Sequence, residues 1–297
     1  MPFDPTQAPV VFGEALFDCF PDGSEVLGGA PFNVAWHLRA FGAAPVFVSR
    51  VGADAFGARI ETAMRQLGMT TVGLQRDAAH ATGTVQVKLE AGEPSYDIVA
   101  GSAYDFIDAD ALPPPPPGGL LYHGTLALRS TDSAAALAGL RAHTDAVFLD
   151  VNLRPPWWSA EQVRALLDGA RWVKLNADEL ALLAPAGDSP ESHAEALMER
   201  HDLARVYGTL GAAGAFALTA GGLLERVSPR AGIEVVDAVG AGDGFAAVLI
   251  LGLLRGWALG ETLERAQHFA SAIVARRGAT IADPDFYAGF TELWGTA

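Results

Sequence analysis

Short hydrophobic runs alternate along most of the chain with longer segments in which apolar residues recur at helical spacing. The first such run covers 10–16, and the first helical pattern covers 31–41. Further strands are predicted at 45–51, 120–123, 146–151 and 172–175, and further helices at 55–67, 131–141, 160–167 and 178–183. Buried strands that are each followed by a helix favour an α/β fold, a mostly parallel sheet with helices on both faces.

One segment, 82–99, breaks this rhythm because its polar and apolar residues alternate with a period of two. The turn residues Ala91-Gly92-Glu93-Pro94 divide it, so we expect an antiparallel hairpin with one face in water. Residues 18–27 are expected to add further strands. Such an insertion forms either a lid over a binding site or an edge hairpin without a function, and the pattern leaves both open.

The C-terminal half carries a second group of short strands, predicted at 204–209, 215–219 and 223–226, and then two helices at 241–254 and 259–276. The five prolines at 113–117 can belong neither to a helix nor to a central strand. We interpret them as a stiff connection. Residues 1–297 are therefore predicted to form a single domain, with a lid of residues 18–29 and 82–101 inserted in it.

Composition narrows the function classes. The formal net charge of −15 disfavours nucleic acids and anionic membranes as partners. Lys88 and Lys174 are the only lysines, which directs any phosphate-binding role to arginines, backbone amides or a metal. Cys19 is the only cysteine, so no disulfide can form within the chain. The N-terminus lacks the basic and apolar regions of a signal peptide, and we expect a cytoplasmic protein.

The strongest chemical signal is the segment 235–247, which reads VVDAVGAGDGFAA. An apolar run is predicted to enter a glycine-rich turn as a strand, and a helix leaves that turn. Free N–H groups at a helix start form an anion site, which the glycines let a phosphate approach closely. Asp243 stands at the mouth of this site, where it could deprotonate an incoming hydroxyl.

Two other readings of this segment stay open. It could be a dinucleotide-binding turn, although the glycine spacing and the position near the C-terminus do not fit one well. It could also be a simple helix cap, with Asp243 as a solvated acid of the first turn. No Gly-Lys pair occurs in the chain, which excludes a P-loop nucleotide site.

Two segments together resemble the signatures of the ribokinase-like (PfkB) carbohydrate kinases. The stretch 237–243 resembles the C-terminal pattern D-[TS]-x-G-A-G-D, and 28–35, GGAPFNVA, resembles the N-terminal pattern GG-x-x-x-N-x-A. The resemblance runs from Gly13 to Gly278 and is closest in look to bacterial fructokinase-like members. It implies a three-layer α/β/α, Rossmann-like (ribokinase-like) fold with a small β-sheet lid.

Within this resemblance, Asp243 would be the catalytic base, and the backbone of Gly240, Ala241 and Gly242 would form the anion hole for the transferring phosphate. The residues that would hold the sugar are Asp18, Gly28, Gly29, Asn33, Arg154 and Asp243 itself. Those that would bind the nucleotide are Asn176, Glu179, Thr209, Gly211, Gly214, Ala241 and Gly242.

The resemblance also implies metal ions. Asn176 and Glu179 would organise Mg²⁺ at the nucleotide phosphates, with Glu179 acting through water. Asp237 and residues 275–278 are candidates for a K⁺ site. Val239 stands where the family often has threonine, which removes side-chain support for that cation.

The function implied is transfer of the γ-phosphoryl group of ATP to a primary hydroxyl of a small sugar, with D-fructose, giving fructose 6-phosphate, as the expected substrate. Alternatives in the family are 2-keto-3-deoxygluconate, whose carboxylate Arg154 could bind, ribose, and a nucleoside. Alternatives of another class are a non-catalytic sugar-binding protein and a nicotinamide oxidoreductase. A homodimer through the lid is also expected.

Overall fold

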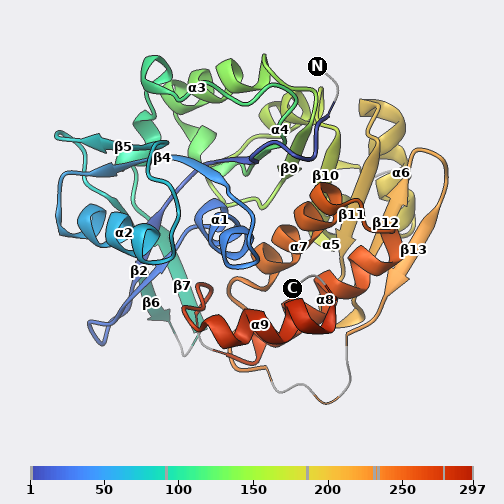
Figure 1. Ribbon diagram of the computed structural model, residues 1–297. Helices are drawn as coiled ribbons and strands as arrows, with labels where there is room; N and C mark the ends of the chain where they lie inside the picture. Colours follow the sequence, from blue (N-terminus) through green and yellow to red (C-terminus); the bar gives the residue numbers. More distant parts are fainter. Residues whose placement is uncertain are drawn as a thin grey trace.

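A nine-stranded sheet forms the centre of the protein (Figure 1). The computed structural model describes residues 3–90, 93–184, 187–229, 232, 235–276 and 278–295. The strand order is β13-β12-β11-β10-β9-β8-β1-β4-β5. The strands span Val10–Phe12 (β1), Val46–Gly52 (β4), Leu74–Asp77 (β5), Leu121–His123 (β8), Val147–Asp150 (β9), Trp172–Asn176 (β10), Arg205–Thr209 (β11), Ala215–Thr219 (β12) and Leu224–Val227 (β13). Neighbours from β5 to β11 pair in parallel, which confirms the predicted mostly parallel sheet.

Helices cover both faces of this sheet. Successive strand residues face opposite sides of the sheet, and both sides carry apolar side chains that must be buried. In β1, Val11 packs into one core while Val10 and Phe12 pack into the other. The first core includes α1 (Ala30–Ala40), α2 (Ala55–Gln66), α7 (Ala241–Arg255), α8 (Leu259–Val274) and α9 (Pro284–Leu293). The second includes α3 (Thr131–Arg141), α4 (Ala160–Leu167), α5 (Ala177–Leu183) and α6 (Pro190–His201). The arrangement confirms the predicted three-layer fold.

A second, four-stranded sheet in the order β3-β2-β6-β7 lies at the lower left of Figure 1 and is called the small sheet below. Its strands are β2 (Leu16–Cys19), β3 (Glu25–Gly28), β6 (Gly83–Glu90) and β7 (Glu93–Ile98). The β6–β7 pair is antiparallel, as predicted, and Val85 and Val87 are buried while Gln86 and Lys88 face water. Of the four predicted turn residues, Ala91 and Gly92 lie outside the described residues, and Glu93 and Pro94 belong to β7 instead of a turn.

The chain crosses from the large sheet to the small one between Phe12 and Leu16, where the sequence pattern predicted one continuous strand. Gly13 makes the crossing with a φ of +149°, and a Cβ there would lie 2.4 Å from Cγ of Pro31. A side chain at this position would therefore clash, and glycine is required. The crossing places the next residue, Glu14, between the two sheets.

The predicted strand at Val235 and Val236 is absent: the chain is irregular there and both side chains are exposed. The N–H groups of Val236 and Asp237 both donate to the carbonyl of Val274 at the end of α8, so this segment is held by a helix end instead of a strand. The pattern also missed β5, α6 and α9, and the long C-terminal helix ends at Val274, before the predicted residue 276. None of the helices in the described part of the chain has the length and hydrophobicity needed to span a bilayer.

Candidate active site

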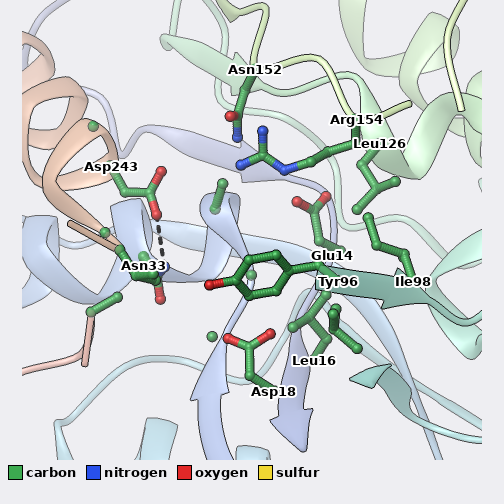
Figure 2. Close-up of a pocket in the computed structure, with 18 of the residues that line it drawn as sticks. Glu14, Leu16, Asp18, Asn33, Tyr96, Ile98, Leu126, Asn152, Arg154 and Asp243 are labelled. Atoms are coloured by element: carbon green, nitrogen blue, oxygen red, sulfur yellow. Dashed lines mark hydrogen bonds between the residues drawn. The ribbon is translucent and has the colours of Figure 1, made fainter. Parts of the chain in front are cut away.

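Two pockets of about 540 Å³ each meet at the N-terminus of α7. The first lies between the small sheet and the carboxyl ends of the central strands, and the second lies beside β11 and α8. Gly242 lines both pockets. All residues predicted to hold the sugar line the first pocket, namely Asp18, Gly28, Gly29, Asn33, Arg154 and Asp243, together with Gly240 (Figure 2). The second pocket is lined by Asn176, Thr209, Gly211, Gly214, Ala241 and Gly242, all of which were predicted to bind the nucleotide.

The N-terminus of α7 is open to a ligand between these pockets. Gly240 precedes the helix with a φ of +82°, and no side chain of the described residues caps the first turn. A Cβ on Gly240 would lie 2.3 Å from Cβ of Ala279, so only glycine fits. The first N–H groups of a helix have no acceptor within it, and the helix dipole gives them a partial positive charge. This end of α7 can therefore bind an anion such as a phosphate oxygen.

Asp243 lies in the first turn of α7 and lines the first pocket, so the reading as a freely solvated helix acid does not hold. Nδ2 of Asn33 donates a hydrogen bond of 2.7 Å to its Oδ2 (Figure 2). Although the carboxylate is reached from the pocket, protein surrounds it otherwise, and this burial raises the pKa of Asp243 to about 6. The Asn33 donor and the positive charges of Lys174 and Arg154 act in the opposite direction. The group can accept a proton near neutral pH.

A buried ion pair lies beneath this site. Nζ of Lys174 donates to both carboxylate oxygens of Asp150 at 2.9 Å, and the hydroxyl of Tyr122 donates to Oδ2 at 3.2 Å. Burial alone would lower the pKa of Lys174, but the pairing with Asp150 raises it, so the ammonium stays charged. A Cβ on Gly242 would lie 3.5 Å from Nζ. This lysine is thus close to the anion site, although the sequence argument had directed phosphate binding away from lysines.

Glu14 and Asp18 add two more carboxylates to the first pocket (Figure 2). Glu14 is 4% exposed, and burial raises its pKa to about 7. Burial and the nearby Asp237 raise the pKa of Asp18 to about 6. Arg154 lowers the pKa of both groups through its charge. Nothing in the sequence around Glu14 shows that its side chain turns into a pocket.

Glu179 was predicted with the nucleotide residues but lines neither pocket. Its carboxylate is buried and accepts hydrogen bonds from the N–H of Leu153 at 2.7 Å and of Asn176 at 2.9 Å. In return, Oδ1 of Asn176 caps the N–H of Glu179 at 2.9 Å. Glu179 therefore joins the loop at the first pocket to the strand end at the second. Burial raises its pKa. Its part in Mg²⁺ binding stays a prediction.

Asp237, the candidate K⁺ ligand, also lies outside both pockets. Its Oδ1 accepts from the N–H of Val239 at 3.0 Å, and its Oδ2 accepts from the N–H of Gly278 at 3.3 Å. The carboxylate thereby ties the loop before α7 to the loop after α8. Within the described residues, no group of three or more His, Cys, Asp or Glu side chains could hold a metal ion. Residue 277 of the predicted K⁺ segment lies outside the described residues.

Comparison with known proteins identifies the class. The model of the pfkB family carbohydrate kinases matches residues 19–285, so the chain belongs to this family. It is a sugar kinase, a phosphotransferase that acts on an alcohol group. The fructokinase of Escherichia coli is 31% identical over 297 residues, covering 92% of this chain and 95% of that protein. Aminoimidazole riboside kinase of Salmonella typhimurium is 29% identical, covering 92% and 91%.

A solved structure agrees with this assignment. The fructokinase from Vibrio cholerae O395, in a form with fructose, ADP and calcium ion bound, superposes with a TM-score of 0.80. The two chains are 26% identical, and the match covers 96% of this chain and 99% of the other.

Proposed function

We propose that the protein transfers the γ-phosphoryl group of ATP to D-fructose and forms fructose 6-phosphate. The observation that supports this most directly is the position of Asp243, at the uncapped N-terminus of α7 and between two pockets that share Gly242. A hydroxyl in the first pocket and a phosphate in the second would meet at this point, as an in-line transfer requires.

Asp243 would act as the general base that takes the proton from the sugar hydroxyl. Its raised pKa suits this role, because a base whose pKa lies near the working pH is ionised and still accepts a proton readily. The hydrogen bond from Asn33 fixes the carboxylate toward the pocket. The N–H groups of Ala241 and Gly242 would receive the negative oxygens of the transferring phosphoryl group.

The nucleotide would occupy the second pocket, beside Thr209, Gly211 and Gly214. The residues present fit a Mg²⁺ ion that arrives with the nucleotide. Mg²⁺ keeps several waters and is held largely by phosphates, so it needs few protein oxygens. Asn176 and Glu179 at the start of α5 would orient that hydration shell, and the ion would neutralise phosphate charge.

Fructose is the proposed acceptor because the relatives named fructokinase match almost the whole chain. The pocket supports a polyhydroxyl ligand: Oδ1 of Asn33 and Oε2 of Glu14 are buried oxygens with no hydrogen-bond partner among the described residues. Buried acceptors without partners are costly, and hydroxyl donors of a bound sugar would satisfy them.

A second candidate acceptor is a riboside such as aminoimidazole riboside. The kinase for this compound is nearly as similar to the chain as the fructokinases are. Tyr96 reaches into the first pocket from β7 and could stack on a flat base (Figure 2).

The substrate is tested by ADP release with MgATP and a panel of fructose, ribose, tagatose, 2-keto-3-deoxygluconate, adenosine and aminoimidazole riboside, with and without K⁺. A clear preference for fructose supports the proposal. Preference for aminoimidazole riboside would show that this riboside, and not fructose, is the acceptor, and would leave the proposed phosphoryl transfer unchanged. No turnover with any acceptor, from protein that binds neither sugar nor ATP, contradicts the proposal.

The Asn33 hydrogen bond gives a pH prediction. This donor lowers the pKa of Asp243, so in Asn33→Ala the pKa rises above about 6. Because the base works only when ionised, kcat is lost as pH falls through that pKa. The acidic limb of the kcat profile should therefore move to higher pH in the variant. Saturating sugar separates this effect from the weaker sugar binding, and a limb at the wild-type position would contradict it.

A further inference from the structure

Glu14 is a buried acid that takes no part in the proposed proton transfer. Its backbone packs closely against Gly29, since a Cβ on Gly29 would lie 2.6 Å from the carbonyl oxygen of Glu14. The residue sits where the chain passes from β1 to β2, and its side chain lines the first pocket. Figure 2 shows its carboxylate on the same side of the pocket as Arg154.

The carboxylate of Glu14 is incompletely satisfied. Its Oε2 has no hydrogen-bond partner among the described residues, although the side chain is almost fully buried. Arg154 influences it through charge, but no ion pair within 4.0 Å joins the two in the described part of the chain. A buried carboxylate oxygen without a donor is unfavourable in a stable fold. A ligand bound in the pocket could donate the missing hydrogen bond to Oε2 of Glu14.

Charge around the pocket indicates the kind of ligand. Glu14, Asp18 and Asp243 all line it. Arg154 lowers the pKa of all three acids, and Lys174 also lowers that of Asp243. Lys174 also lines the pocket but is bound to both oxygens of Asp150. Within the described structure, these three carboxylates therefore face one arginine and one lysine, and the lysine is already paired with Asp150. A further carboxylate on the ligand would be repelled.

We propose that Glu14 is a specificity-determining residue: its free oxygen accepts a hydrogen bond from a sugar hydroxyl, and its charge engages Arg154, so that the pocket takes neutral polyhydroxyl sugars and rejects sugar acids. The inference rests on the proposed function and names the acceptor class for that site. In this proposal, Arg154 neutralises the charge of the pocket carboxylates and is therefore not free to bind the carboxylate of a keto acid.

Two variants separate the hydrogen bond from the charge. Glu14→Gln keeps the shape of the side chain and removes its charge. Glu14→Asp keeps the charge but shortens the side chain, which moves the carboxylate away from the pocket. We would measure kcat and KM for fructose and for 2-keto-3-deoxygluconate at pH 8, which is above the raised pKa of Glu14 of about 7. Glu264→Gln, on the exposed side of α8, is the matched control.

In Glu14→Gln, KM for fructose should rise about tenfold while kcat changes less, because a charged acceptor is lost from binding. Turnover of the sugar acid should improve, so that the ratio of kcat/KM between fructose and the acid falls by about 100-fold. Glu14→Asp should raise KM for fructose but keep the rejection of the acid. Glu264→Gln should match the wild type in every respect.

The proposal is overturned if Glu14→Gln leaves both KM for fructose and the selectivity ratio within about twofold of the wild type. It is also overturned, without any variant, if the wild type prefers the sugar acid. That result would still leave Asp243 and the kinase chemistry in place. If the wild type prefers another neutral sugar, only fructose as the substrate fails, and the same variants are measured with that sugar. A variant that does not fold leaves the wild-type preference to decide.

Discussion

Asp243→Asn is expected to lower kcat by about 10³-fold, because an amide cannot take the proton of the sugar hydroxyl, and a general base contributes roughly 10²–10⁴-fold. The substitution preserves shape, and an amide oxygen can still accept the 2.7 Å hydrogen bond from Asn33. KM for the sugar should therefore change by no more than a few-fold. Steady-state kinetics and calorimetric titration with fructose give the two quantities separately.

The matched control is Asp132→Asn, which neutralises an exposed acid in the first turn of another helix, α3. It should retain wild-type kcat. Wild-type turnover in Asp243→Asn would remove Asp243 as the base. Loss of sugar binding along with turnover would instead mean that the carboxylate mainly holds the substrate.

Much of the fold follows from local pattern. The helices Thr131–Arg141 and Ala160–Leu167 begin and end where the sequence predicts. Each starts after a serine whose side chain caps the first turn, at Ser130 and Ser159, so the boundary is encoded locally. Helix α6, with the sequence PESHAEALMERH, was missed because polar residues outnumber the apolar ones that it buries. Its helical pattern is weak without the partner that it packs against.

The site divides in the same way. Residues 237–243 and 28–35 stand out because glycines and acids cluster within a few positions, and the structure brings Asn33 and Asp243 together across 210 residues of sequence. Lys174 and Glu14 could not be recognised from their neighbours. Lys174 lies in the middle of a buried strand, and Glu14 follows a hydrophobic run. The crossing between the two sheets turns Glu14 to the pocket, and the pairing of β9 with β10 places Lys174 beside Asp150 at the same pocket. Neither arrangement can be recognised from the local sequence.

Lys174→Met is expected to destabilise the protein by about 3–5 kcal/mol, because it leaves the carboxylate of Asp150 buried without its counter-ion. Asp150 is 1% exposed, and Tyr122 would supply its one remaining side-chain hydrogen bond within the described residues. Urea unfolding followed by tryptophan fluorescence measures the change through the denaturation midpoint at constant slope. The variant should also lose turnover where it is folded, since the ammonium beside Gly242 no longer supports the anion site.

The double variant Lys174→Met/Asp150→Asn tests the cause. The double variant has no unpaired buried ion, so much of the lost free energy of unfolding should be regained. Its activity should stay low. A single variant that loses less than about 1 kcal/mol would show that water or a shift of the Asp150 side chain relieves the buried charge. Restored activity in the double variant would mean that Lys174 serves only to neutralise Asp150. In that case the N–H groups of α7 and the nucleotide's Mg²⁺ would carry the phosphate charge without it.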